Sequence, residues 1–275
     1  MFELPPPQDD GLCIPVVPEH SKYKHHFIRR YIDIFTTSMK DKKWSGLHYI
    51  DLFAGAGIER LKTSRKIDWG SPLIAAQAPF SFTKLHLCEE VSEKHHALEV
   101  RVNRFRPDSQ IIQGDANKKI SQIVADIPDK TLSLSFLDPY GLHLEFKTLK
   151  VLANIRTDLI IFFPDRLDAL RNWAAYYLDN PESNLDLCLG SGVDWRSRLS
   201  KAPTHQRAEV LRDVYIEQIR DKLGYTEFDC ERITTTRGNP IYYLIFCSRS
   251  PTAVHLWRRI AEKKPNGQRT FKFEP

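Results

Sequence analysis

Five short apolar runs constrain the fold of this chain more than any other feature of its sequence. They cover residues 47–53, 84–88, 109–113, 132–137 and 158–163, and each is separated from the next by a length that suits a crossover helix or loop. A strand that is buried on both faces reads as a continuous apolar run. The pattern therefore predicts a parallel sheet that is covered by helices on both sides.

The C-terminal part of the chain adds two antiparallel strands to this inventory. Apolar runs at 225–233 and 241–248 flank the turn Arg237-Gly238-Asn239-Pro240, which is typical of a hairpin. Helical spacing is found from residue 21 onward, and over 92–105, 206–223 and 252–263, with Gly224 placed to end the third of these helices. We expect an α/β fold, namely a Rossmann-like, doubly wound, mostly parallel seven-stranded sheet with a C-terminal antiparallel hairpin.

Proline and glycine suggest how the chain is divided. Residues 1–20 contain five prolines and no periodicity, so they are predicted to be an irregular leader. Residues 21–163 and 205–263 form the Rossmann-like domain in this interpretation. The intervening segment 164–204 breaks the strand and helix rhythm and is interpreted as an insertion or cap, and 264–275 as a polar tail.

Composition narrows the class of protein. The 275 residues include 41% hydrophobic and 27% charged residues, as in ordinary globular proteins, and the formal charge of +5 is compatible with a nucleic acid partner. The sequence contains no apolar run long enough for a bilayer and no basic-then-apolar leader, which predicts a cytoplasmic protein without a membrane partner. Five scattered cysteines, none in a C-x-x-C pair, indicate reduced thiols, and no metal site is expected.

The strongest local motif follows the first apolar run, in Asp51-Leu52-Phe53-Ala54-Gly55-Ala56-Gly57. Its glycines let the backbone approach a ligand closely, and the turn offers N–H groups to an anionic group. In this context the segment resembles the S-adenosylmethionine loop of class I methyltransferases. The resemblance implies cofactor contacts by Phe53, Ala54, Gly55 and Gly57, and Asp51 stands where a carboxylate would receive an ammonium group. A plain strand-to-helix turn is the alternative.

Two further turns stand where neighbouring strands end. Glu89, with Glu90 as the alternate, follows the second apolar run, where an acidic side chain of an open α/β sheet can bind the hydroxyls of a ribose. Gly114-Asp115-Ala116-Asn117 follows the third run and resembles the adenine-contacting turn of the methyltransferases, with Asp115 accepting from the exocyclic amine and Ala116 offering its N–H. Taken alone, the first would be a solvated helix charge and the second an Asx turn.

The fourth run ends in Asp138-Pro139-Tyr140-Gly141. This segment resembles the D-P-P-aromatic loop of methyltransferases that act on exocyclic amines, and the resemblance implies that Asp138 orients the acceptor amine, beside the cofactor, while Pro139 and Tyr140 shape the pocket. It departs from that loop because Tyr140 replaces the second proline and Gly141 takes the aromatic position. A simple turn is again the alternative.

Together, the ordered blocks resemble one particular group of proteins. Residues 49–57, 70–75, 137–141 and 243–249, with Trp257 downstream, are similar to the three-Cys-motif partner proteins over about residues 24 to 260. The resemblance implies a methyltransferase-like bacterial or phage protein that binds S-adenosylmethionine and works beside a three-cysteine, radical S-adenosylmethionine-like partner.

Histidines and arginines give weaker indications. Adjacent pairs at His25-His26 and His95-His96 point to different helix faces and are interpreted as surface residues, not ligands of one metal. Arginines and aromatics alternate through 166–207, either as a nucleotide-binding surface or as the small core of the insertion with solvated arginines.

Two functions follow from these observations. The first is an S-adenosylmethionine-dependent methyltransferase that acts on an amino group of a nucleic acid base. The second is a non-catalytic, cofactor-binding partner of the three-cysteine protein. A nuclease is disfavoured because no carboxylate cluster has metal-binding spacing, and a dinucleotide oxidoreductase because Gly55-Ala56-Gly57 lacks the third glycine.

Overall fold

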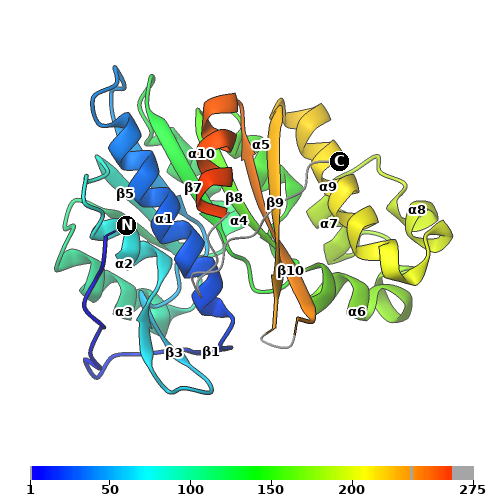
Figure 1. The fold of residues 1–275 in the computed structure, drawn as a ribbon, viewed down its shortest axis with the longest axis horizontal. Coiled ribbons are helices and arrows are strands. Elements are labelled where there is room, and N and C mark those ends of the chain that lie inside the picture. Colours follow the sequence, from blue (N-terminus) through cyan, green and yellow to red (C-terminus); the bar gives the residue numbers. More distant parts are fainter. Residues whose placement is uncertain (1, 236–237, 262–275) are drawn as a thin grey trace.

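The computed structural model describes residues 2–235 and 238–261 of the chain (Figure 1). Strands within these ranges are β1 Val16–Val17, β2 Leu47–Asp51, β3 Ile58–Leu61, β4 Ile67–Trp69, β5 Lys84–Glu89, β6 Gln110–Gln113, β7 Leu132–Leu137, β8 Thr157–Phe163, β9 Glu227–Thr234 and β10 Pro240–Ser248. The main helices are α1 Ser21–Met39, α2 Ser71–Ala76, α3 Ser92–Asn103, α4 Ala116–Ala125, α5 Phe146–Leu152, α9 Arg207–Leu223 and α10 Pro251–Ala261. The tail 264–275 and the end of the helix expected over 252–263 lie outside the described residues.

Seven strands form the central sheet in the order β6-β5-β2-β7-β8-β10-β9. The first five are parallel, and β10 runs antiparallel to both β8 and β9. The chain starts in the middle of the sheet at β2, winds outward to β6, returns to β7 and β8, and closes with the hairpin. The fold class expected from the sequence, a Rossmann-like, doubly wound, mostly parallel seven-stranded sheet with a C-terminal antiparallel hairpin, is confirmed.

Helices cover both faces of this sheet, as the continuous apolar runs predicted. One buried cluster packs α1, α2, α3 and α10 against the first face, and a second packs α4, α5 and α9 against the other. Alternation along β8 shows how a single strand serves both clusters, since Ile160 and Phe162 belong to the first and Leu159, Ile161 and Phe163 to the second. Figure 1 shows α1 and α10 in front of the sheet, where Trp257 stacks on Phe246 at 4.8 Å between ring centroids.

A second, smaller sheet was not foreseen from the sequence. Strands β3 and β4 form a hairpin directly after the glycine turn, and β1 of the leader pairs parallel with β3. The segment 1–20, expected to be irregular, therefore contributes a two-residue strand and lies against the domain. These strands are too short, and β1 too rich in proline neighbours, to give a recognisable period.

Residues 164–204 fold into short helices that adjoin the second cluster. They comprise π-helical turns η1 Asp165–Ala169 and η2 Trp173–Tyr177, helices α6 Leu170–Asn172, α7 Asn184–Leu189 and α8 Trp195–Lys201, and the 3₁₀ turn η3 Thr204–Gln206. Ser183 begins α7 with a capping box, in which its side chain and that of Asp186 satisfy each other's backbone N–H groups. No helix within the described ranges has the length and apolar character required to traverse a bilayer.

Candidate cofactor and acceptor site

Asp51, the last residue of β2, holds in place the turn that follows it, residues 52–57, which we call the glycine turn. This carboxylate is completely buried and accepts hydrogen bonds from the Phe53 N–H at 3.2 Å, the Tyr49 hydroxyl at 3.2 Å and the Ser71 hydroxyl at 2.6 Å. Burial raises the pKa of Asp51 to about 7. Three of the roughly four acceptor positions of this carboxylate are thus used inside the protein. Asp51 therefore stabilises the turn. Its direct contact with a ligand's ammonium group stays a prediction.

Open space lies beside the first glycine of the turn. Gly55 has a φ of +65°, and a Cβ built there would meet no atom within 4 Å. Gly57, by contrast, is packed, because its carbonyl accepts the N–H of Gly70 at 2.8 Å and thereby joins the turn to the start of α2. The turn is fixed on one side and accessible on the other, as close approach by a ligand requires.

Glu89 connects the glycine turn to the loops that follow β5 and β6. One of its carboxylate oxygens accepts the Gly55 N–H at 2.9 Å, the other accepts the Val91 N–H at 2.8 Å, and its backbone carbonyl accepts the Gly114 N–H at 3.0 Å. The side chain is buried, whereas that of the alternate candidate, Glu90, is exposed. Each oxygen of Glu89 keeps a lone pair for a further donor.

The loops that follow β6 and β7 are also joined by hydrogen bonds. Asp115 is the N-cap of α4 and accepts the Asn117 N–H at 2.9 Å, and Ala116 is buried. Asn117 in turn donates to the His143 carbonyl at 2.8 Å and accepts from the Glu145 N–H at 3.1 Å. A continuous set of hydrogen bonds therefore links the loops after β2, β5, β6 and β7 along the carboxyl edge of the sheet.

The acid of the fourth loop has a partner that sequence reasoning missed. Asp138 forms an ion pair with Lys24 of α1, and both side chains are largely buried. Burial by itself lowers the pKa of Lys24, but the carboxylates of Asp138 and Glu59 outweigh it and raise that pKa. From the sequence, Lys24 was only one of several cations on the helix before β2, and nothing in its spacing distinguished it.

Glu59 and His25 complete this buried group. The two side chains lie 3.6 Å apart, and burial raises the pKa of Glu59 while it lowers the pKa of His25 to about 4. His25 was expected at the surface with His26, but it is buried with 3% exposure. The correction has a simple cause, since the unpredicted strand β3 covers this face of α1.

Tyr140 and Gly141 continue the loop in opposite environments. Tyr140 is 93% exposed, so its ring does not line an enclosed pocket, and Pro139 before it is buried. Gly141 has a φ of +71°, and a Cβ there would lie 2.7 Å from the Asp168 carboxylate. This clash would add to the strain of a left-handed backbone, so glycine fits the position on both counts.

Asp168 was also missed from the sequence, and it ties residues 164–204 to this loop. Its carboxylate accepts the Leu142 N–H at 3.1 Å, the Tyr177 hydroxyl at 2.6 Å and the Asn172 amide at 2.8 Å. The segment therefore supports the loop after Gly141 and leaves Tyr140 uncovered.

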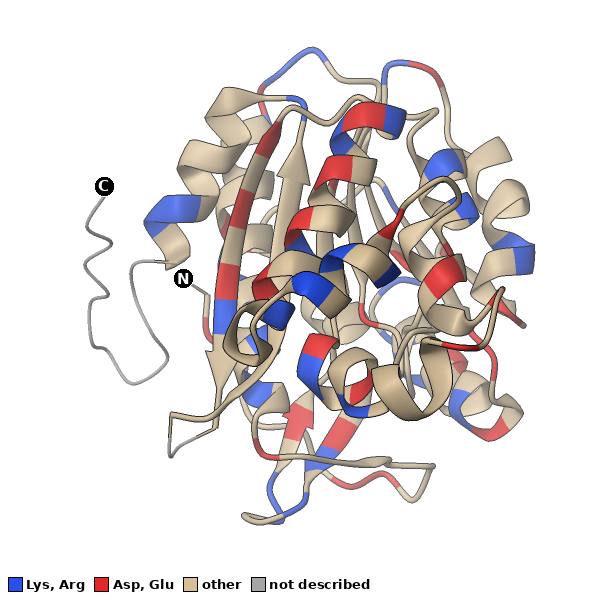
Figure 2. Cartoon of the chain, turned by 90° about the vertical axis from the view of Figure 1, so that its right-hand side faces the viewer, with Lys and Arg blue, Asp and Glu red and all other residues tan. Residues whose placement is uncertain are grey.

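The arginines and aromatics of this segment divide into two groups. Trp195 and Tyr177 are buried in the second cluster, Arg196 pairs with Asp186, and Arg198 pairs with Glu217. Within the described residues, Arg166 and Arg171 are exposed and their side chains make no ion pair, and Tyr176 is 57% exposed. Charges of both signs are mixed over this side of the molecule (Figure 2). Some of the aromatics thus belong to a core, which is the one shared with the sheet, and a nucleotide-binding surface stays a prediction.

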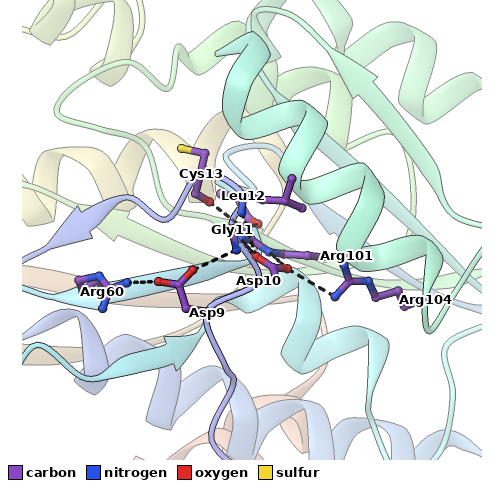
Figure 3. Close-up of polar contacts among 9 residues, drawn as sticks. Asp9, Asp10, Gly11, Leu12, Cys13, Arg60, Arg101 and Arg104 are labelled. Carbon is purple, nitrogen blue, oxygen red and sulfur yellow. Dashed lines mark hydrogen bonds and ion pairs between the residues drawn. The ribbon is translucent and has the colours of Figure 1, made fainter.

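Arg101 of α3 joins the leader to the glycine turn, and Figure 3 shows its contacts with the leader. Arg101 of α3 is 2% exposed and donates to the carbonyls of Ala56 at 2.6 Å and Cys13 at 2.8 Å. The same guanidinium makes two hydrogen bonds to the Asp10 carboxylate, at 2.6 and 3.0 Å. One buried arginine thus joins α3, the leader and the turn.

Comparison with solved structures agrees with this architecture. Protein LPL1258 from Legionella pneumophila matches with a TM-score of 0.54 at 12% identity, over 90% of this chain and 94% of that one. The likeness shows the fold. Cofactor-bound Rv0187 from MTB matches with a TM-score of 0.47 at 9% identity, over 81% of this chain and 79% of its own. TYW2 of M. jannaschii, solved in complex with AdoMet, matches with a TM-score of 0.39 at 9% identity, over 82% and 74%.

Sequence comparison adds no relative. No family model matches the chain, and no curated protein is similar to it in sequence. The resemblance to the three-Cys-motif partner proteins stays a prediction from the ordered blocks of residues.

Proposed function

We propose that this protein binds S-adenosylmethionine at the carboxyl edge of its sheet and transfers the methyl group to an amino group of a nucleic acid base. The observation that supports this most directly is the pair of hydrogen bonds by which Glu89 joins Gly55 to Gly114. Three expected cofactor contacts thus lie next to one another at the carboxyl edge of the sheet. They are the turn for the amino-acid end of the cofactor, the acid for its ribose and the turn for its adenine.

In this proposal each residue has a distinct role. Gly55 offers the open backbone beside which the ligand lies, with Phe53, Ala54 and Gly57 shaping the turn. Glu89 binds the ribose hydroxyls through the lone pairs that its two internal hydrogen bonds leave, while Asp115 and Ala116 contact the adenine. Asp51 acts through the turn that it holds.

The acceptor would enter beside Asp138 and Tyr140. An exposed aromatic ring is a surface on which a base can stack, and Tyr176, Arg166 and Arg171 supply a second ring and two cations from the neighbouring segment. These groups suit a flipped or single-stranded nucleotide, whose base must leave its stack before an amine can reach the cofactor. Methyl transfer then depends mainly on alignment of the amine with the methyl group.

Calorimetric titration with S-adenosylmethionine tests the cofactor site. Glu89→Ala removes the proposed ribose ligand and the brace of Gly55, and we expect a loss of affinity of at least about a hundredfold, the size that two charge-assisted hydrogen bonds imply. Glu90→Ala is the matched control, because it removes the adjacent exposed carboxylate, and its affinity should equal that of the unmutated protein. Absence of binding by the unmutated protein would refute the proposal.

The ion pair between Lys24 and Asp138 favours a second function, the non-catalytic partner of a three-cysteine protein. In the structure the acid that would hold an acceptor amine is already engaged by an ammonium group. Incubation with labelled S-adenosylmethionine and DNA or RNA separates the two functions. A methyltransferase incorporates label and Asp138→Asn abolishes incorporation without loss of cofactor binding, whereas a partner protein binds the cofactor and incorporates none.

A further inference from the structure

A cleft lies at the amino edge of the sheet, opposite the proposed cofactor site. It has a volume of about 860 Å³ and is bordered by the first residues of β7 and β8, the last residue of β10, the end of α1 and the start of α10. We call this the amino-edge cleft. A volume of this size accommodates a small organic ligand, and the proposed cofactor residues do not line it.

The walls of the amino-edge cleft are apolar and partly aromatic. Tyr31, Phe35 and Met39 of α1 lie along one side, Leu256 of α10 along another, and Trp44 lies in the turn between α1 and β2. Trp44 is held in place by its backbone, since its N–H donates to the Lys42 carbonyl at 2.9 Å and the next residue, Ser45, bonds to Lys130. Tyr31 and Phe35 are almost completely buried, so the partly exposed side chains of Trp44, Met39 and Leu256 are the ones that offer a flat organic group a stacking surface and apolar contact.

Three cations surround these walls, and none has an ion-pair partner among the described residues. The side chains of Lys42, Lys43 and Arg156 line the cleft, and none makes a hydrogen bond or ion pair with another residue of 2–235 or 238–261. The guanidinium of Arg156 lies 5.9 Å from the centre of the Trp44 ring, within the range of a cation–π contact. A ring and a positive group therefore face the same space.

The other charged groups of the cleft are used within the protein. Arg249 donates to the carbonyls of Ala153, Ile155 and Leu223 at 2.9 to 3.1 Å. Asp158 is 7% exposed and accepts the hydroxyls of Tyr31 at 2.9 Å and Ser248 at 2.6 Å. What a ligand meets is therefore an apolar wall bordered by unpaired positive charge.

We propose that the amino-edge cleft binds a nucleoside phosphate, with the base against Trp44 and the wall of α1 and the phosphate against Lys42, Lys43 and Arg156. A free phosphate would leave the apolar wall unused, and a neutral nucleoside would leave the cations unpaired. The nucleotide is either a free small molecule or one residue of a single-stranded nucleic acid. The site does not depend on the proposed methyltransferase function.

Titration with guanosine monophosphate tests this site, with S-adenosylhomocysteine present at saturating concentration to occupy any adenosyl-binding site. We expect binding that is at least tenfold tighter than that of guanosine or inorganic phosphate. In Lys42→Ser/Lys43→Ser/Arg156→Ser the affinity should fall at least tenfold. Lys62→Ser/Lys66→Ser/Arg65→Ser is the matched control, because it removes three exposed cations from the turn between β3 and β4, and it should bind as the unmutated protein does.

A variant that fills the cleft gives an independent check. Ala253→Trp places a large ring at a cleft-lining position of α10 without changing charge, and it should also weaken binding at least tenfold. The proposal is overturned if guanosine monophosphate fails to bind, or if its affinity is the same in the cleft variants and in the control. Calorimetry of S-adenosylmethionine on the same variants should be unchanged, so that failure here is distinguishable from failure of the cofactor site.

A ten-nucleotide single-stranded RNA distinguishes the two sources of the nucleotide. If the cleft serves a nucleic acid, the RNA binds at least tenfold tighter than the mononucleotide and loses that affinity in the triple variant. If it serves a free nucleotide, the RNA gains nothing over the mononucleotide.

Discussion

Asp158 is a carboxyl group placed among apolar neighbours, with the hydroxyls of Tyr31 and Ser248 as its hydrogen-bond donors. Burial raises its pKa to about 6, against the partly opposing effect of the hydroxyls. Between about pH 4 and pH 6 the folded protein holds a proton that the unfolded chain has released. The free energy of unfolding therefore falls as the pH rises through this window, by at most about 3 kcal/mol from this group.

This dependence can be isolated with Asp158→Asn, which keeps an acceptor for Ser248 and cannot ionise. We expect the unfolding free energy of the unmutated protein, relative to the variant, to decrease between pH 4 and pH 7 in urea titrations. Asp126→Asn is the control, because salt bridging to Lys84 lowers the pKa of Asp126 and its effect has the opposite sign. The prediction would be contradicted if the difference in unfolding free energy between Asp158→Asn and the unmutated protein did not vary with pH.

At the scale of elements, one buried ion pair fastens the leader to α3. Asp10 faces a guanidinium that is 2% exposed, and hydrogen bonds from Arg101 lower the pKa of Asp10. Asp9, its neighbour, pairs with Arg60 while its own side chain is 56% exposed (Figure 3). The two aspartates thus allow a direct comparison of a buried and an exposed ion pair within the leader.

We expect Asp10→Asn to lower the free energy of unfolding by about 3 kcal/mol, since it leaves a buried guanidinium without its counter-charge. Asp9→Asn should cost less than about 1 kcal/mol, as exposed pairs do. Chemical unfolding at pH 7 measures both. Equal effects of the two variants would mean that the leader is not held through Arg101.

At the scale of the molecule, one sheet separates two apolar clusters, and the segment 164–204 belongs to the second. Leu185, Trp195 and Leu199 of this segment are buried in the same cluster as Ile161 and Phe163 of β8. The segment therefore shares a core with the sheet, and the chain should unfold in one transition.

Leu199→Ala tests this arrangement. Removal of a completely buried leucine side chain from a shared core should lower the global free energy of unfolding by about 2–5 kcal/mol. Far-ultraviolet circular dichroism and tryptophan fluorescence should report coincident transitions in the variant, as in the unmutated protein. An earlier fluorescence transition with an unchanged main transition would show that 164–204 folds separately.

The sequence by itself determined the central sheet and the positions of its edge loops. Strands such as β7 and β8 are buried on both faces, so their local composition already reports their environment. Adjacent parallel strands end at or just before four acidic residues, and the topology then places these along one edge: Asp51, Glu89, Asp115 and Asp138.

Only the tertiary structure decided which groups these residues meet. Lys24 lies 114 positions from Asp138, and Asp168 reaches back to the N–H of Leu142, while no local period marks either residue. The same holds for Asp10 and Arg101, which are 91 positions apart. Secondary structure follows from periodicities within a few residues, whereas the pairing of charges across a sheet edge depends on how distant elements pack, and that information is not present in any one segment.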